Sequence, residues 1–434
     1  MSLAFNEQAV ASLKNLPAAP WLENIRASGA QVFSVTPWPN RKTENWKYTS
    51  LFALDQQAYH GAAPQVNLAD DQLFAIAGLD AQRLVFVNGH FNAALSDKID
   101  GLVCVPFSQA NAEQQALIAQ KLNGTFKQEQ HLFGALNNAA LQEGVLIHLT
   151  KNQVCKKPVQ IVHVQSADAG FSSYARHVIV LEQHSEATVL EHFVSAAKIA
   201  ENIHNQLTEV FVGEGAKLNH YRLHLESGSQ SHFGGVHVNL AANAVFNSFQ
   251  LALGGKIKRI DVVVNHQGSG AHSEINGVYL PKEKQHIDFH TCIEHAVPHC
   301  TSNEVFRGII ADQAKAVFNG RIHIHKHAQK TAAELSNKNL LLSNQAEINT
   351  KPELEIYADD VRCAHGATIA QLDEKARFYL QSRGISRQEA EVMLSFGFIN
   401  ELIDGIELEP VAQLLRPILA KQFISDERLA RHLI

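Results

Sequence analysis

The most regular feature of the chain is a series of short segments in which apolar and polar residues alternate, from about residue 143 to about residue 370. Alternation with period two, bounded by Gly, Asn and Asp, is typical of β-strands that bury one face. No helix-length segment separates these strands, which argues against an alternating strand–helix sheet. The clearest segments read GVLIHLT, VQIVHVQS, HVIVLEQ, LTEVFVGE, VHVNLAAN, RIHIHKH and LEIYADDV.

A weak repeat runs through the same region. The pattern Ala-x-apolar-Asn begins at positions 216, 244, 316 and 346, so the first and last intervals are short and the middle interval is more than twice as long. Periods of roughly 20–50 residues are typical of stacked units that cannot bury a core alone. We therefore predict a parallel β-helix with a looped-out insertion in the longest interval, and a right-handed coil by the crossover rule. An antiparallel sandwich is the alternative fold.

Helical patterns flank the strands on both sides. Residues 1–125 are predicted to be mostly helical, and within them the segment RKTENWKYTSL mixes charged and aromatic residues unlike a plain core helix. Residues 373–434 contain a helix that ends at Gly384, a residue type favoured just after a helix C-terminus. A second helix there begins with Ser386 and Glu389 at capping-box spacing.

These patterns predict three parts: a mostly helical region at 1–125, a β-helix core at 126–372 and a helical region at 373–434. The open ends of a β-solenoid need to be covered because unpaired strand edges invite association. We expect the two helical regions to cover those ends and to leave faces for partners.

Composition narrows the class of protein. The chain has 434 residues, of which 45% are hydrophobic and 18% are charged, as is usual for a globular protein. A formal net charge of −6 gives no basic surface for nucleic acid or for an anionic membrane. The longest stretch without charged residues, 233–255, is too polar to span a membrane, and the start of the chain does not resemble a signal peptide. Five scattered cysteines indicate reduced thiols in a cytoplasmic protein.

Two histidine-rich segments raise the question of metal binding. His323, His325 and His327 share one face of a predicted strand, where neighbouring side chains stand roughly 6.5–7 Å apart. Such a row suits a metal ion poorly without a third group from elsewhere, so a solvated strand face is the favoured interpretation. The segment 286–300 is denser, and His286, His290 and Cys292 would share a face of its strand. Its Cys292 and Cys300 lie too far apart in the chain to match a closed structural zinc site.

The segment YADDVRCAHGAT places Cys363 and His365 two positions apart, on one face of the last predicted strand. In extended backbone this pair is too far apart for a thiol–imidazole hydrogen bond, so a cysteine hydrolase is disfavoured. A thiolate and an imidazole on one face can instead provide part of an iron or iron–sulfur site that a partner chain completes. A buried, inert cysteine beside a turn histidine remains the alternative on spacing alone.

Motifs for nucleotide hydrolysis and for common hydrolases are absent. The sequence contains no GxxxxGK[ST], GxGxxG, GxSxG or HExxH. The chain therefore shows no nucleotide-hydrolysis motif of its own.

Four stretches together resemble one known family. They are RKTENWKYTSL, NGRIHIHKHAQKTAAELSNKNLLLS (319–343), TKPELEIYADDVRCAHGATIAQLD (350–373) and YLQSRGISRQEAEVMLSFGFI (379–399). With them, nearly the whole chain is similar to the SufB/SufD family of iron–sulfur cluster assembly scaffolds. SufB-like members have an acidic residue where this chain has Gly366 and carry additional cysteine ligands, so the resemblance is to the SufD-like branch.

This resemblance implies a right-handed parallel β-helix between helical regions. It also implies a non-catalytic scaffold that forms a heterodimer with a SufB-like chain and docks a SufC-like ABC-type ATPase, mainly on its C-terminal helices. His365 matches the family histidine that helps to hold a nascent iron–sulfur cluster at the scaffold interface, and Cys363 matches a cysteine of the same motif. The cluster would be transient and shared with SufB, and ATP would bind only to the ATPase.

Two other functions remain as alternatives. A carbohydrate-active β-helix enzyme would need clustered carboxylates, of which only Asp359–Asp360 stands out. A purely structural interaction module would keep Cys363 buried and inert. An isolated chain could also form a homodimer through the surface meant for its partner scaffold.

Overall fold

Consecutive strands of the alternating region do not pair with each other. Each one pairs with the strand after next, so that β11 (Val245–Leu253) lies parallel to β9 (Lys217–His224) and to β13 (His272–Leu280). The intervening β12 (Ile257–His266) belongs to a second sheet. This is the pairing of a coil that alternates between two sheets.

The computed structural model describes residues 19–55, 71–166, 170–196, 201–226 and 228–423, together with Phe5, Ala9, Leu13, Leu16, Val66 and Leu68.

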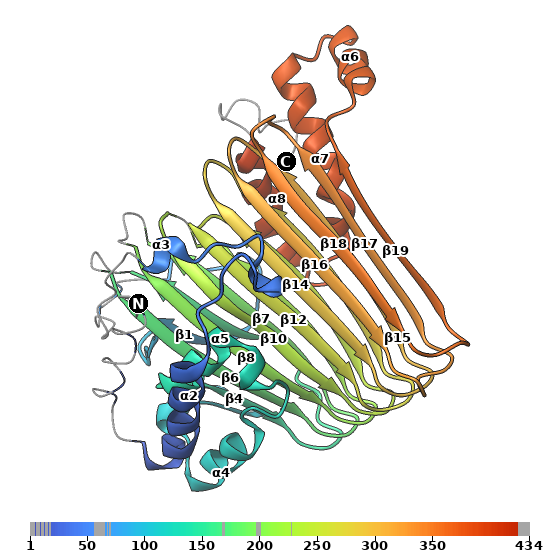
Figure 1. Cartoon of the computed structure of the whole chain (residues 1–434). Coiled ribbons are helices and arrows are strands. Elements are labelled where there is room, and N and C mark those ends of the chain that lie inside the picture. The colour runs from blue at the N-terminus through green and yellow to red at the C-terminus, as the bar shows by residue number, and fades with distance from the viewer. Residues whose placement is uncertain are drawn as a thin grey trace.

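Within these residues the strands form a ten-stranded and a nine-stranded sheet, stacked as a parallel β-solenoid of about seven turns (Figure 1). The ten-stranded sheet has the order β19 (Arg362–Ala370), β17 (Ala332–Leu341), β15 (Thr301–Ile310), β13, β11, β9, β7 (Glu186–Ser195), β5 (Val159–Gln165), β1 (Gln82–Val87) and β2 (His90–Phe91). The nine-stranded sheet has the order β18 (Glu347–Ile356), β16 (Lys315–Ile324), β14 (His286–His295), β12, β10 (Ser231–Leu240), β8 (Ile203–Val212), β6 (Ser172–Leu181), β4 (Glu143–Leu149) and β3 (Val103–Pro106). The prediction of a parallel β-helix with helices on both sides is confirmed, and the sandwich is not formed.

The core lies between the two sheets, where the apolar positions of every strand point inward. Toward the C-terminal rungs, aromatic rings from alternate sheets follow one another. The ring centroids of Tyr279 and Phe289 are 5.8 Å apart, those of Phe289 and Phe306 are 5.4 Å apart, and those of Phe306 and Phe318 are 5.0 Å apart. Aromatic pairs at these separations stabilise a core beyond their buried area.

Toward the N-terminal rungs the interior is polar. Glu191 is fully buried and accepts hydrogen bonds from Arg222, 2.7 Å away, and from His220, 2.8 Å away. Much of the surplus of histidines is also found here, and burial lowers the pKa of several, so these rings stay neutral near pH 7. They are His163, His177, His204, His224 and His232.

The region before residue 125 holds more than helices. It contains α2 (Glu23–Val35), α3 (Phe52–Asp55) and α4 (Ala112–Lys121), but β1 to β3 also lie in it and pair with the solenoid. The helix α5 (Leu132–Ala139) then crosses the outer face of the nine-stranded sheet. There the Asn137 side-chain amide donates to the carbonyl oxygens of Ala175 and Asn205, at 3.0 and 2.9 Å.

The RKTENWKYTSL segment is anchored to the same outer face. Arg259 of β12 donates to the carbonyl oxygen of Asn45 at 2.7 Å and to the carboxylate of Asp288 at 2.9 Å, while its guanidinium stacks 4.8 Å from the Trp46 ring centroid. The Thr49 hydroxyl donates to the same Asp288 carboxylate. The mixture of charge and aromatics in this segment is therefore explained by a buried arginine that it covers.

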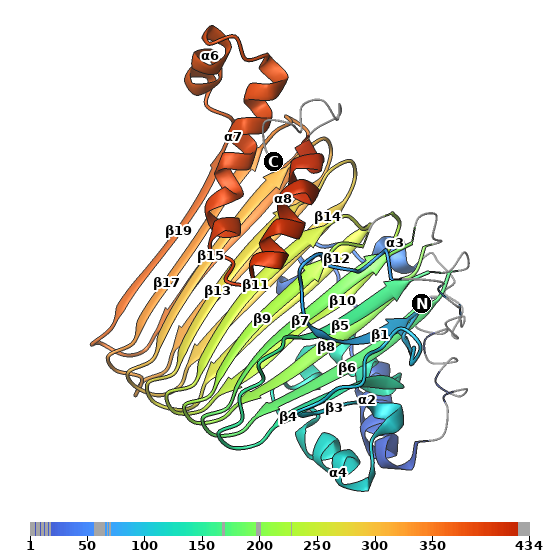
Figure 2. The same ribbon diagram turned by 180° about the vertical axis from the view of Figure 1, so that it is seen from behind.

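The C-terminal helices are α6 (Glu374–Ser382), α7 (Arg387–Asp404) and α8 (Glu409–Phe423). Figure 2 shows α7 and α8 lying across the ten-stranded sheet, while α6 projects beyond it. The contact is apolar, and burial of this kind is worth about 25 cal/mol per Å². Its buried residues include Ile399, Ile403, Val411, Leu415 and Leu419 from the helices, and Leu223, Leu251, Val278 and Ile309 from the sheet.

Two details of the sequence reading are wrong. The long interval between positions 244 and 316 holds no looped-out insertion, because the chain from β11 to β16 continues the coil without interruption. The repeat that starts at 216 and 244 lies in adjacent rungs, where the Asn247 amide donates to Asn219 at 3.1 Å, whereas the later copies lie in the other sheet.

The helices also do not cover the C-terminal end of the coil, since α7 and α8 lie on an outer face. The division near residue 125 stays a prediction.

Glu304 gives a pH-dependent test of the interior. It points inward from β15 and is completely buried, and desolvation raises the pKa of its carboxyl group from 4.5 to about 8. Between pH 4.5 and about 8, Glu304 therefore keeps its proton in the folded chain, whereas it has released that proton in the unfolded chain. We expect the contribution of Glu304 to the free energy of unfolding to fall by a few kcal/mol as the pH rises from about 4.5 to about 8, while the buried histidines contribute in the opposite direction.

The Glu304→Gln variant mimics the protonated acid, so its free energy of unfolding should rise relative to that of the parent chain as the pH increases. Urea unfolding of both chains at pH 5 and pH 8 measures this difference. Glu334→Gln removes an exposed carboxylate from the neighbouring β17 and should keep the pH dependence of the parent chain. Identical pH profiles for Glu304→Gln and the parent chain would contradict the prediction.

Candidate functional site

The last rung of the solenoid is formed by β18, a corner at residues 357–361, and β19. Asp359 and Asp360 form part of this corner. The Gln329 side-chain amide donates to Asp359 at 2.8 Å, and Lys330 forms an ion pair with Asp360. Both carboxylates thus bind the loop of the preceding rung. Because they are engaged in these contacts, a catalytic role for them in glycoside hydrolysis is not favoured.

Cys363 and His365 sit on β19, opposite Ala333 and Leu335 of β17. These two partners belong to the buried core, and neighbouring residues in parallel strands point the same way, so Cys363 and His365 face the interior of the solenoid. No further rung covers them in the described part of the chain. Cys363 is accordingly half-buried against the end of the core, and His365 is exposed. The prediction that they share a face on the last strand is confirmed.

The outer edges of β18 and β19 are paired with no strand among the described residues. An unpaired edge presents backbone N–H and C=O groups that can bind another strand. Large apolar side chains are exposed beside these edges, with Tyr357 at 62% and Ile369 at 51% of full exposure. The end of the coil thus combines hydrogen-bonding edges with apolar surface, as expected of a docking surface.

The pair at this end offers two donors of different kinds. Desolvation raises the pKa of the Cys363 thiol, opposed in part by a hydrogen bond from the Ala333 backbone, so the thiol is mostly protonated at neutral pH unless a metal displaces the proton. No third Cys, His, Asp or Glu from the described residues completes a metal-binding group with Cys363 and His365. Any metal centre at this end would need ligands from another chain.

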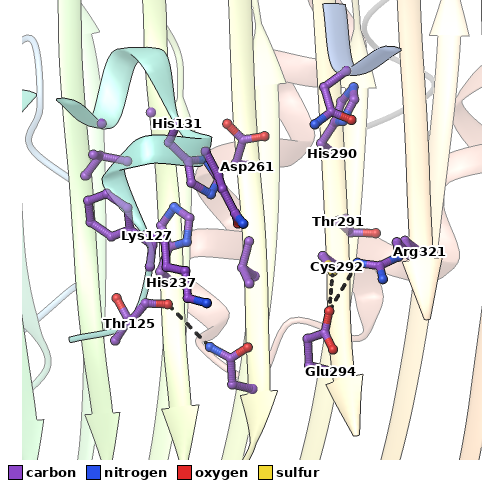
Figure 3. Close-up of a pocket in the computed structure, with 18 of the residues that line it drawn as sticks. Thr125, Lys127, His131, His237, Asp261, His290, Thr291, Cys292, Glu294 and Arg321 are labelled. Atoms are coloured by element: carbon purple, nitrogen blue, oxygen red, sulfur yellow. Dashed lines mark hydrogen bonds and ion pairs between the residues drawn. The ribbon is translucent and has the colours of Figure 1, made fainter. Parts of the chain in front are cut away.

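A second group of donors lies on the outer face of the nine-stranded sheet, in a groove of about 710 Å³ that Figure 3 shows in close-up. His290 and Cys292 share the outward face of β14 there, and the pattern of burial places His286 on that face too, as the sequence predicts. His323 and His325 both lie beside Glu294. The sequence reading did not identify Glu294, because it lies on a different strand from the two histidines and no local pattern marks it.

Family models match almost the entire chain. The model described as the SufBD core domain of SUF system FeS cluster assembly matches residues 163–398, and the model described as the SufBD protein N-terminal region matches residues 5–161. The chain belongs to the SufBD family. The core match includes β18, β19 and both Cys363 and His365, and the two matches meet within β5.

Curated relatives agree with this assignment. The iron–sulfur cluster assembly protein SufD of Escherichia coli K12 is 34% identical over 381 residues, which cover 87% of this chain and 88% of that protein. SufD of Bacillus subtilis is 26% identical over 93% of this chain and 94% of that protein. An iron–sulfur cluster assembly SufBD family protein of Synechocystis is 28% identical over 91% of this chain and 90% of that protein.

The resemblance drawn from the sequence is therefore confirmed, and this SufBD family chain is a protein of iron–sulfur cluster assembly. In the described part of the chain, no helix has the length and apolar character required to cross a membrane.

Thiol labelling tests the position of Cys363. We expect a soluble disulfide reagent to modify the half-buried Cys363 of the native protein well before the buried Cys104 and Cys300. The rate should rise with pH, because the thiolate is the nucleophile and burial raises the pKa of this thiol. Cys363→Ser should remove one early equivalent, whereas Cys104→Ser should leave the early phase unchanged. If Cys363 reacts only after unfolding, it is the buried, inert thiol expected of a purely structural interaction module.

Proposed function

We propose that this chain is a non-catalytic scaffold subunit of the Suf system that pairs with a SufB-like scaffold and docks a SufC-like ABC-type ATPase. Its cargo is a nascent iron–sulfur cluster, which is held transiently at the interface between the two scaffolds and then released. The observation that carries the proposal is the open end of the solenoid, where two unpaired strand edges adjoin the inward-facing Cys363 and His365.

Strand addition is the simplest way to cover this end. A second solenoid with its own open edges can continue both sheets by backbone hydrogen bonds, while Tyr357 and Ile369 bury apolar surface against it. A SufB-like chain would then bring its own ligands beside Cys363 and His365. The same edges could join two copies of this chain when the partner is missing.

The donor set suits a site that must release its cargo. His365 is an exposed imidazole donor, and an imidazole binds iron less tightly than a thiolate does. Cys363 starts as a protonated thiol. Because two donors do not fill the coordination of a cluster, most ligands would come from the partner. A cluster held in this way can leave when the two scaffolds separate or twist.

Replacement of His365 tests the site directly. In the complex co-expressed and purified without oxygen, we expect His365→Ala to leave the recovery of all subunits unchanged, because the side chain is exposed and contributes little to the fold. Bound iron and acid-labile sulfide should fall several-fold, since one cluster ligand is lost. The matched control is His327→Ala, an exposed histidine outside the last rung, which should retain the parent content. Unchanged cluster and complex yields in His365→Ala would contradict the proposed role.

The ATPase must supply the nucleotide chemistry, because the sequence lacks a P-loop. The projecting helix α6 is the strongest docking candidate, since none of its described residues is buried and it exposes Phe378 at 72% and Tyr379 at 57%. Neighbouring exposed aromatic side chains often mark a protein interface.

The double variant Phe378→Ala/Tyr379→Ala should therefore lose at least about tenfold in affinity for the ATPase subunit, as loss of interface hot spots usually does. The unfolding midpoint of the isolated chain should stay the same. Val35→Ala removes an equally exposed apolar side chain from α2 and should bind like the parent. Wild-type affinity in the double variant would rule out α6 as the docking element.

A further inference from the structure

A second set of metal-ligating side chains lies away from the open end, on the outward face of β14 and β16. Glu294 and His323 are direct neighbours in the parallel register of these strands. His325 follows two positions later, and its ring centroid is 4.2 Å from that of His323. A row of histidines on one strand lacks a third ligand, and here the adjacent rung supplies it.

The three side chains converge on one point. The Glu294 Oε2 atom is 2.6 Å from His323 Nδ1 and 2.8 Å from His325 Nε2. The ligand atoms of all three lie within 4.8 Å of one another. Ligands of a tetrahedral ion, bound at about 2.0–2.1 Å, stand roughly 3.3 Å apart. The two oxygen–nitrogen distances are therefore only about 0.5–0.7 Å shorter than an ion requires, and the two ring nitrogens would have to approach each other by at most about 1.5 Å.

A thiol lies at the other oxygen of the Glu294 carboxylate, outside the group of three converging ligand atoms. Cys292 precedes Glu294 by two positions on the same face of β14, and its Sγ atom is 3.5 Å from Glu294 Oε1. Figure 3 shows Cys292, Glu294 and Arg321 side by side at one part of the groove. The two imidazoles of the group themselves select Zn²⁺-like ions over the hard cations Mg²⁺ and Ca²⁺.

Arg321 orients the carboxylate of this group. It donates to Glu294 Oε1 at 3.1 Å, which leaves Oε2 facing the two histidines, and it is itself held by Glu355 at 2.9 and 2.8 Å. Partners that fix a ligand in this way are a regular feature of metal sites. The two carboxylates and one guanidinium carry a formal charge of −1, which favours a cation.

The site is also accessible, because the side chains of Glu294 and His325 are 22% and 45% exposed. The other candidate group, His204, Glu226 and His232, is fully buried inside the solenoid. There Lys258 already forms an ion pair with Glu226, so a positive ion has no uncompensated negative charge to bind.

From this geometry we propose that Glu294, His323 and His325 form a binding site for a divalent transition-metal ion of the Zn²⁺ class and leave the fourth position to water. The site lies on the outer face of the nine-stranded sheet, and it uses ligands of this chain alone. It is separate from the cluster-holding pair Cys363 and His365.

Cobalt is the probe, because tetrahedral Co²⁺ has strong visible absorption. The full chain is titrated with Co²⁺ without an affinity tag and with reduced thiols, and Zn²⁺ is then added as a competitor. We expect tetrahedral Co²⁺ to bind and to be displaced by Zn²⁺. A wild-type chain that shows no tetrahedral cobalt spectrum would overturn the proposal.

Variants locate the ion. His325 follows the end of β16 and is exposed, so His325→Ala should fold normally and bind Co²⁺ at least about tenfold more weakly. His327→Ala should bind like the parent. Cys292→Ser should bind like the parent, because its thiol lies at the other oxygen of the Glu294 carboxylate. Cys363→Ser/His365→Ala should bind normally. Parent affinity in His325→Ala, or loss of binding in Cys363→Ser/His365→Ala, would refute this site.

Discussion

Each strand of the solenoid depends on backbone hydrogen bonds to the rung before it and to the rung after it, and this requirement governs both ends of the coil. At the first rungs, β2 and β3 run antiparallel to their neighbours and bring the two stacks to an end. At the last rungs, β18 and β19 are paired on one side only within the described chain. The rung that lacks a successor is the one that carries Cys363 and His365, so an incomplete interior and two open edges occur together.

Stacking in register also determines which distant residues meet. One turn of the coil takes in one strand of each sheet, and side chains one turn apart lie on the same face at neighbouring positions. In this way Glu294 lies beside His323, and Asn219 beside Asn247. The same stacking gives the interior two distinct ends, with aromatic rings near the last rungs and neutral histidines around the Glu191–Arg222 pair near the first. A site on this scaffold therefore forms across rungs more easily than along one strand.

The outer faces have a different role. The N-terminal segment and α5 cover part of the nine-stranded sheet, and α7 and α8 cover part of the ten-stranded sheet. Sequence reading assigned these helices to the ends of the coil, because an open edge is the more obvious liability. The apolar stripe formed by Val278, Ile309 and their neighbours on the outside of the sheet is the reason for the difference. It has to be buried, and a helix lying flat on the sheet buries more of it than a helix across the end.

The sequence by itself determined the coil, the helical regions and the shared face of Cys363 and His365, because alternation, repeat period and capping spacing are patterns along the chain. It also carried the family motifs around residues 350–399. Only the tertiary structure decided four other features. They are the absence of an insertion, the three early strands, the role of Arg259 under the RKTENWKYTSL segment and the position of Glu294 beside two histidines. Those features depend on which rung lies next to which, and pairing between strands a full turn apart leaves no mark on the local pattern of either strand.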